Sequence, residues 1–476
     1  MLRKLARRVF YVFSGVALVG AILYAGGLRI VRYGGGGIGF AFTESAEKRA
    51  AEIEQHREAQ RAQTPEPVQA APQAATPSTA PSADEPPPED VRASAHWTSF
   101  RGPNGAGYYG QQPVRTDWGG ALTPLWKQPV GGGFSSFVIA KGRAFTIEQR
   151  GSRELAAAYD VATGRELWTT AWEALFRSSM GGDGPRATPA WHEGRLYVLG
   201  GTGEFRALDA ATGRTLWRTN ILSDAGTGAP EFGVSASPLI VDDTVVVLAG
   251  GANGKSVVAY DCASGKRVWG ALDDRAAYSS PMLVTLAGVR QILTLTETRL
   301  VGLSPEDGKL LWEFPWRTPN QASQPLVAGP DRVFVSAGSG VDAVMLQLSA
   351  GADGQFAARE LWRTNRMNND FSSAVLHDGF IYGLDGSILS CIDASTGELK
   401  WKGGRYGVGQ LILASGHLIV LTEEGELALV RADPKAHQEV ARFQALEGKT
   451  WNHPALSDGI LVFRNTEEMA AFSLRK

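Results

Sequence analysis

Short apolar segments alternate with turn residues along most of the chain, from about Trp97 to the C-terminus. Val257–Tyr260 is one such segment, and the turn after it places Asp261 and Gly265 at fixed offsets before Trp269. The Asp side chain of such a turn accepts hydrogen bonds from turn amides, and the Gly supplies a positive φ. Short strands separated by tight turns predict an all-β fold.

The same turn and its following Trp recur at intervals of about 45 residues, the period of a four-stranded propeller blade. Two copies are AYDVATGRELW (158–168) and ALDAATGRTLW (207–217), and each Trp ring is expected to pack between neighbouring blades. With Phe443 standing in the last copy, the pattern is carried by Trp126, Asp160, Gly164, Trp168, Asp209, Gly213, Trp217, Asp261, Gly265, Trp269, Gly308, Trp312, Trp362, Asp393, Gly397 and Trp401. The sequence predicts an eight-bladed β-propeller.

The two ends of the repeat region complement each other. Three strand-like segments follow Phe443, near His453–Leu456, Ile460–Arg464 and Met469–Leu474, where a blade needs four. The isolated segment Leu125–Val130 supplies the fourth strand, so an N-terminal strand is expected to complete the last blade. Such pairing closes the ring and removes both sheet edges.

The first 33 residues have the pattern of a membrane anchor. Arg3, Lys4, Arg7 and Arg8 precede an uncharged run from Val9 to Leu28, and 20 residues of helix span a hydrocarbon core of about 30 Å. The basic cluster places the N-terminus in the cytoplasm. We therefore predict a single-pass protein of a bacterial inner membrane with its propeller in the periplasm; a cleavable signal peptide is the alternative.

Residues 34–96 are predicted to be a flexible linker between this anchor and the propeller at 97–476. Gly34–Gly37 forms a joint, and Glu44–Gln63 is charged and Ala-rich, which suits a short exposed helix of marginal stability. Prolines are frequent from Pro65 to Pro88, as in an extended, semi-rigid spacer.

The net charge and the cysteine content exclude several classes of function. Lys+Arg 47 against Asp+Glu 49 gives a net charge of −2, and no basic stripe follows the first few residues, so a nucleic-acid partner is not expected. Cys262 and Cys391 are the two cysteines, which excludes a disulfide-stapled scaffold and a haem attachment site. Both are expected to be small buried side chains.

The motif A-x-D-x-x-T-G-[RK]-x-x-W resembles the pyrroloquinoline-quinone (PQQ) repeat, also called the tryptophan-docking motif, and the stretch Trp97–Gly105 resembles the opening segment of bacterial PQQ-like propellers. The resemblance covers about Trp97 to Lys476. It implies one of two branches: quinoprotein alcohol dehydrogenases, which hold PQQ and Ca²⁺, or the non-catalytic branch typified by the lipoprotein of the outer-membrane barrel-assembly machinery. The enzymes cover their cofactor with a vicinal disulfide, which Cys262 and Cys391 are too far apart in sequence to form.

The loops that join each blade to the next are expected to meet at one mouth of the central channel, where propellers bind their ligands. These loops have a mixed-charge, aromatic and Asn-rich composition suited to a protein, a peptide or a polar small molecule. His453 precedes Pro454 and is expected to be structural, and no His pair has metal-ligand spacing. The candidate rim residues are Arg186, Glu231, Asp274, Arg275, Tyr278, Asn320, Asn369, Asp370, Arg405, Tyr406, Trp451, Asn452 and His453.

These observations favour a membrane-anchored interaction scaffold or accessory subunit with a protein partner in the cell envelope, acting for example in outer-membrane protein assembly. They predict no catalytic residue, metal or cofactor. Two alternatives remain open. One is an oxidoreductase that holds PQQ and Ca²⁺ and uses a rim Asp such as Asp274 or Asp370 as base. The other is a binding module for a polar ligand.

Overall fold

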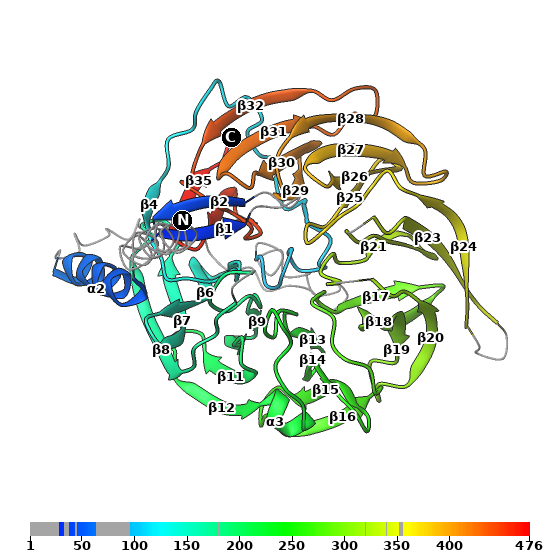
Figure 1. Ribbon diagram of the computed structural model, residues 1–476, viewed down its shortest axis with the longest axis horizontal. Helices are drawn as coiled ribbons and strands as arrows, with labels where there is room; N and C mark the ends of the chain where they lie inside the picture. The colour runs from blue at the N-terminus through cyan, green and yellow to red at the C-terminus, as the bar shows by residue number, and fades with distance from the viewer. Residues whose placement is uncertain are drawn as a thin grey trace, which may run out of the picture.

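The computed structural model describes residues 28–32, 38–42, 45–62, 96–178, 181–318, 320–338, 340–351 and 356–476. Within these ranges the chain forms a ring of eight antiparallel sheets, the blades, which follow one another in chain order (Figure 1). Each blade has four strands ordered from the channel outward, here called A to D. The predicted eight-bladed all-β propeller is confirmed.

The first four blades follow the same plan, and their strands have these bounds. Blade 1 comprises β5 (Val138–Ala140), β6 (Arg143–Arg150), β7 (Arg153–Asp160) and β8 (Glu166–Glu173). Blade 2 comprises β9 (Ala190–His192), β10 (Arg195–Leu199), β11 (Glu204–Asp209) and β12 (Thr215–Asn220), and α3 (Ile221–Ala225) follows it. Blade 3 comprises β13 (Leu239–Val241), β14 (Thr244–Gly251), β15 (Lys255–Asp261) and β16 (Arg267–Ala271). Blade 4 comprises β17 (Met282–Leu286), β18 (Val289–Leu295), β19 (Arg299–Leu303) and β20 (Leu310–Pro315).

The other four blades include the two that depart from the plan. Blade 5 comprises β21 (Leu326–Gly329), β22 (Arg332–Val335), β23 (Ala343–Ala350) and β24 (Phe356–Thr364). Blade 6 comprises β25 (Val375–His377), β26 (Phe380–Asp385), β27 (Ile388–Asp393) and β28 (Leu399–Arg405). Blade 7 comprises β29 (Gln410–Ala414), β30 (His417–Leu421), β31 (Glu426–Arg431) and β32 (Glu439–Gln444), with β3 (Tyr108–Tyr109) parallel to β29. Blade 8 comprises β33 (Ala455–Ser457), β34 (Ile460–Arg464), β35 (Glu468–Ser473) and β4 (Trp126–Pro129).

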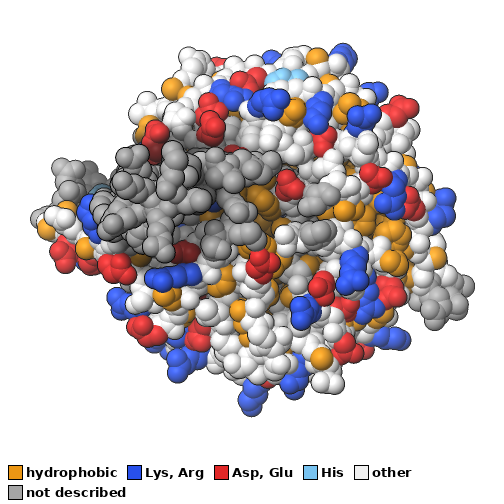
Figure 2. Space-filling view, in the orientation of Figure 1, with side chains coloured by type: hydrophobic (Ala, Val, Ile, Leu, Met, Phe, Trp, Pro, Cys, Tyr) orange, Lys and Arg blue, Asp and Glu red, His pale blue; other side chains and the backbone are white. Residues whose placement is uncertain are grey.

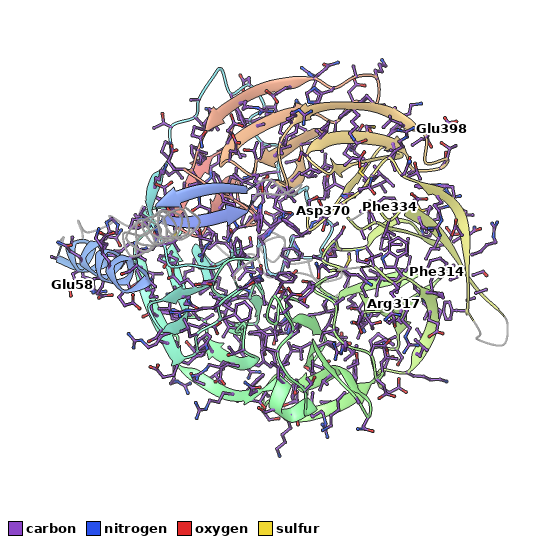
Figure 3. The ribbon with its side chains drawn as sticks, in the orientation of Figure 1. Glu58, Phe314, Arg317, Phe334, Asp370 and Glu398 are labelled. Carbon is purple, nitrogen blue, oxygen red and sulfur yellow. The ribbon has the colours of Figure 1, made fainter. Side chains whose placement is uncertain are left out.

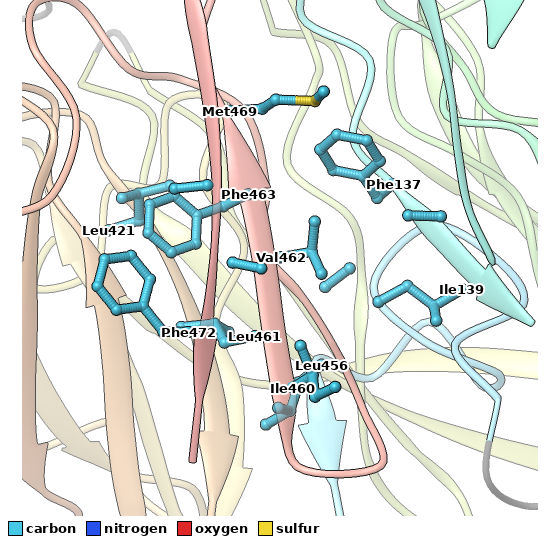
Figure 4. Packing of buried hydrophobic residues seen from close by; sticks show 14 of the residues in the cluster. Phe137, Ile139, Leu421, Leu456, Ile460, Leu461, Val462, Phe463, Met469 and Phe472 are labelled. Carbon is cyan, nitrogen blue, oxygen red and sulfur yellow. The ribbon is translucent and has the colours of Figure 1, made fainter. Parts of the chain in front are cut away.

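Blade 8 closes the ring as the sequence predicts. Its three C-terminal strands are completed by β4, which pairs antiparallel with β35 and places Trp126 opposite Ala471. On the inner side of the closure, Phe137 and Ile139 of blade 1 face the buried Leu456 and Val462 of blade 8 (Figure 4). The first and last blades therefore share one hydrophobic core.

The repeated Trp and Gly residues form the contacts between blades. The indole ring of Trp217 in blade 2 covers Gly265 in blade 3, where a Cβ would lie 2.6 Å from the indole. The indole N–H donates to the Cys262 carbonyl of blade 3 at 3.0 Å. The turn also holds as predicted, because the Asp261 side chain accepts from the Ser264 amide at 2.7 Å and Gly265 has a φ of 69°. Equivalent Trp-over-Gly pairs are Trp126–Gly164, Trp168–Gly213, Trp269–Gly308 and Trp362–Gly397.

Trp312 departs from this rule. Its indole N–H donates to Gln291 of its own blade. Blade 5 has no Thr-Gly turn to receive it, because β23 and β24 continue into a longer hairpin there. Cys262 and Cys391 are buried and unpaired, as expected from the sequence.

The N-terminal part differs from a simple anchor and linker. Residues 1–27, most of the predicted anchor, and 63–95, the Pro-rich part of the linker, lie outside the described residues. Strands β1 (Leu28–Arg32) and β2 (Ile38–Phe42) pair antiparallel across the predicted boundary at residue 33. Among the residues that the structure describes, no helix is both long enough and apolar enough to cross a membrane.

Helix α2 (Ala46–Ala62) forms where the sequence predicts a short exposed helix, but it is docked on the propeller. Ile53 and Arg57 are fully buried, and Arg57 lies between blades 8 and 1. The Arg57 guanidinium donates to Gln128 Oε1 and to the Pro129 carbonyl, both at 2.7 Å, and lies 3.4 Å from Glu166 and 5.2 Å from the Tyr159 ring centroid. This helix therefore spans the joint at which the ring closes.

Replacing Arg57 by alanine is expected to release α2 and to cost about 1–3 kcal/mol, because Gln128 and the Pro129 carbonyl each lose the hydrogen bond that the buried guanidinium donates. Hydrogen exchange of the full-length chain should show faster exchange over residues 46–62. The matched control is Glu58→Ala, one position along on the exposed face of the same helix (Figure 3). Equal protection of α2 in the wild-type chain and in Arg57→Ala would contradict the docking.

Candidate functional site: the mouth of the channel

The segment 97–109 closes one end of the channel. Trp97 pairs with Ile139 of blade 1, the Thr98 carbonyl accepts from Trp191 of blade 2 at 2.8 Å, and β3 runs beside the first strand of blade 7. Arg101 is 1% exposed and donates to the Ala374 carbonyl of blade 6 at 2.8 Å. Because the segment reaches strands on opposite sides of the ring, it crosses the channel and leaves a blind pocket above it.

A belt of hydroxyl groups joins the blades around this channel. The amide of Thr188 donates to Ser237 Oγ and that of Ser237 to Ser280 Oγ, each at 2.9 Å, so the segments that enter blades 2, 3 and 4 are tied to one another. Ser136 with Thr188, and Gln324 with Ser373, repeat this contact at 3.0 Å. In the Ser-Pro pairs Ser237-Pro238 and Ser280-Pro281, the Ser belongs to this belt and the Pro directly precedes β13 or β17.

Above the belt the pocket opens between the loops that connect strand D of each blade to strand A of the next. These loops emerge at the same end of the ring because every blade has the same antiparallel order. The cavity has a volume of about 290 Å³, and its lining is mostly apolar, with several aromatic rings. Its main lining residues are Phe100, Phe134, Arg186, Phe232, Tyr278, Asn320, Phe371, Trp451 and His453.

Two cations lie against the aromatic wall. The Arg186 guanidinium lies between the rings of Phe134 and Phe176, 5.2 and 5.1 Å from their centroids. The Lys449 ammonium lies 3.8 Å from the Trp451 centroid and 5.6 Å from that of Phe134. Burial lowers the pKa of Arg186 to about 10 and that of Lys449 to about 8, with Glu423 opposing and Arg186 reinforcing the shift of Lys449. Both side chains are charged at neutral pH.

Trp451 is held in place from behind. Its indole N–H donates to Glu423 Oε1 at 2.9 Å, while Glu423 Oε2 accepts from the Val408 amide at 3.2 Å. On its other side the Phe371 ring lies 4.7 Å away, centroid to centroid. His453 in the floor is neutral, because burial and the neighbouring Arg101 lower its pKa to about 3.

The structure brings together five of the thirteen candidate rim residues: Arg186, Tyr278, Asn320, Trp451 and His453 line the pocket. Glu231 and Arg275 are exposed in the surrounding loops, and Arg405 is exposed at the end of β28. Asp370 lies toward the centre of the ring, whereas Glu398, in a turn at the opposite end of a blade, lies at its periphery (Figure 3).

The remaining candidates have structural contacts. Asp274 is paired with Arg299 at 2.6 Å. Tyr406 is buried, and its hydroxyl bonds to His437 and Glu439 at 2.8 and 2.7 Å. Asn369 and Asn452 are fully buried, and Asn452 donates to the Ser135 carbonyl at 2.9 Å. His453 is also buried, as expected for a residue with a structural role.

Several residues of the mouth do not appear among the sequence candidates: Phe100, Phe134, Phe232, Phe371 and Lys449. Phe232, Phe371 and Lys449 lie in the same connecting loops as the candidate rim residues, most of which are polar. The available signal was the aromatic residue that recurs in successive loops. Phe134 and Phe100 precede blade 1 and so fall outside the repeat altogether.

Comparison with known proteins identifies the family. The model for outer membrane protein assembly factor BamB matches residues 152–403, just over half of the chain. The chain belongs to the BamB family. Its BamB relative from Yersinia pestis is 25% identical over 279 residues, 56% of this chain and 68% of that protein. BamB from Bordetella pertussis (strain Tohama I) is 25% identical over 260 residues, 51% of this chain and 58% of that protein.

Solved structures share the fold at low sequence identity. BamB from Moraxella catarrhalis superposes with a TM-score of 0.53 and 14% identity, covering 74% of this chain and all of that one. A europium-containing methanol dehydrogenase gives a TM-score of 0.59 and 13% identity, covering 80% of this chain and 98% of that one. The propeller fold is therefore common to the BamB family and to quinoproteins. The fold alone does not distinguish a scaffold from an enzyme, so the residues of the mouth have to be compared with those that a quinoprotein needs.

The residues of the mouth do not fit Ca²⁺ and PQQ. A Ca²⁺ site needs several oxygen ligands with carboxylates among them. No group of three His, Cys, Asp or Glu side chains in the described ranges is placed to hold a metal ion. Asp274, one of the two acids that could act as base, is already paired with Arg299. Cys262 and Cys391 are unpaired and lie in different blades, so they form no cover for a flat cofactor.

Proposed function

We propose that this chain is a non-catalytic interaction scaffold of the cell envelope that takes part in the assembly of outer-membrane proteins. The observation that carries the proposal is the match of the BamB family model to residues 152–403. The N-terminal segment would tether the propeller to the inner membrane, with the propeller in the periplasm and its partner an envelope protein.

The mouth supports a binding role. Its lining contains four Phe side chains together with Tyr278, Trp451 and Arg186, and these residue types are enriched at protein–protein contacts. Over the face shown in Figure 2, Lys and Arg side chains are interspersed with Asp and Glu. A surface of mixed charge suits a protein partner better than a nucleic acid.

The proposal is tested by depleting the chain in its host and following the assembly of outer-membrane β-barrels. Folded barrels migrate faster than unfolded ones on unheated denaturing gels, so the folded fraction is measured directly. We expect that fraction to fall on depletion and to recover when the wild-type chain is supplied. Unchanged folded fractions and barrel abundance in the depleted cells would contradict the proposed function.

A further inference from the structure

We propose that the mouth pocket binds a protein segment in which an aromatic side chain stands next to an acidic one. This inference rests on the proposed function, since it names the partner chemistry of the same site. It requires two features side by side: an apolar pocket of side-chain size, and positive charge at its wall.

The pocket is apolar and small. Phe134, Phe232, Phe371 and Trp451 stand around it, above a floor that includes Phe100. Pockets for drug-sized ligands occupy about 300–1,000 Å³, so a cavity of about 290 Å³ holds a side chain or two. An aromatic side chain buries a large area at low entropic cost and gains from offset or edge contacts with neighbouring rings.

The positive charge at the wall is not neutralised by a close ion pair. Among the described residues neither Arg186 nor Lys449 forms an ion pair within 4.0 Å, although both are partly desolvated. Arg186 donates to the carbonyls of Gly182 and Gly184 at 2.8 and 3.0 Å, which holds its guanidinium in place. Cations removed from water without a carboxylate partner gain from an incoming anion.

The two features share their residues. Phe134 is contacted by both cations, and Lys449 stands over the face of Trp451. A ring inserted beside Phe134 and Trp451 therefore places an adjacent carboxylate within reach of Lys449. A cationic ligand would be repelled by the same two side chains, and a neutral apolar one would leave them desolvated.

The charge state of Lys449 gives the site a pH dependence. The charged groups that face it are Arg186 from the loop after blade 1 and Glu423 from the loop after β30. Lys449 is protonated below a pKa of about 8 and loses its charge as the pH rises through that value. Affinity for an acidic segment should therefore fall between about pH 7 and pH 9.5, and in Lys449→Gln it should not.

The test titrates the full-length chain with capped peptides by calorimetry. The probe is Gly-Ser-Asp-Phe-Ser-Gly, with Asn-Phe and Asp-Ala versions as controls and phenylacetate as the free aromatic acid. We expect saturable binding of the Asp-Phe peptide, weakened about tenfold by Lys449→Gln or Trp451→Ala and largely kept in Trp451→Phe. Lys435→Gln, an exposed lysine in a turn at the opposite end of blade 7, is the matched control and should bind as the wild type does.

Three results would overturn the inference. The first is no saturable binding of the Asp-Phe peptide at millimolar concentration, the second is equal binding of the Asn-Phe and Asp-Phe peptides, and the third is binding that Lys435→Gln weakens as much as Lys449→Gln. Phenylacetate binding as tightly as the peptide would assign the pocket to a small aromatic acid instead. If depletion impairs barrel assembly while the peptide does not bind, the scaffold function stands and the partner docks elsewhere.

Discussion

Replacing Trp217 by alanine is expected to lower the free energy of unfolding by about 3 kcal/mol, the lower end of the range for truncating a core aromatic side chain, because the indole is partly buried. The ring covers Gly265 of the next blade and packs edge-on against Phe205 at 5.2 Å. Its N–H donor to the Cys262 carbonyl is lost as well. Gly265 has no side chain that could fill the space, so the two blades lose contact where they meet.

Denaturant unfolding of the full-length chain measures this loss. The control is Trp217→Phe, which keeps most of the ring and removes the N–H, and should cost about 0.5–1.5 kcal/mol for the hydrogen bond. A cost below about 1 kcal/mol for Trp217→Ala would show that the repeated Trp is not what joins the blades.

Replacing Glu148 by alanine is also expected to cost about 3–5 kcal/mol, because it leaves the buried Arg464 guanidinium without a carboxylate, while Arg150 keeps its ion pair with Glu166. The Glu148 carboxylate is 0% exposed and accepts from Arg150 and from the Tyr159 hydroxyl, each at 2.6 Å. Arg464, also fully buried, depends on the same negative charge. Both cations lie at the joint between blades 8 and 1, so the ring should open there first.

The same carboxylate predicts an acid-labile component of stability. Burial would raise the pKa of Glu148, but Arg150, Arg464 and the hydrogen bond from Tyr159 outweigh it and hold the pKa at about 2. The folded pKa lies below the unfolded value of about 4.3, so the stabilisation is present above that pH and is lost as the pH falls toward 2. Unfolding measured between about pH 6 and pH 3 should show a steeper loss for the wild type than for Glu148→Ala. Parallel curves would contradict this assignment.

The ring of eight blades was predictable because the repeated Asp, Gly and Trp residues form turns and contacts that depend on the local sequence. Asp261 and Gly265 define a turn wherever they occur, and the Trp that follows needs only the next copy of the turn to pack against. Leu125–Val130 could be assigned to the last blade because a blade lacking its fourth strand leaves an open edge. The docking of α2 could not be predicted, since it depends on Arg57 reaching a site more than seventy residues further along the chain.

The mouth was predictable in position and only partly in composition. The connecting loops do converge there, but the backbone of each loop decides which side chains turn inward. Tyr406 and Trp451 stand in equivalent loops, yet Tyr406 bonds to Glu439 within blade 7 and Trp451 lines the pocket. Loop sequence alone does not distinguish these outcomes, because they are decided by contacts with neighbouring blades.

The most direct test of the account is site-specific crosslinking in living cells from two exposed positions. A photoreactive phenylalanine analogue is placed at Asn320, beside the mouth, or at Lys435, at the opposite end of the propeller. The account predicts a crosslink from Asn320 to a protein of the outer-membrane assembly pathway, weakened by a second substitution, Trp451→Ala, with no equivalent crosslink from Lys435. A crosslink to that protein from Lys435 alone, or one from Asn320 that Trp451→Ala leaves unchanged, would contradict the assignment of the mouth as the docking site.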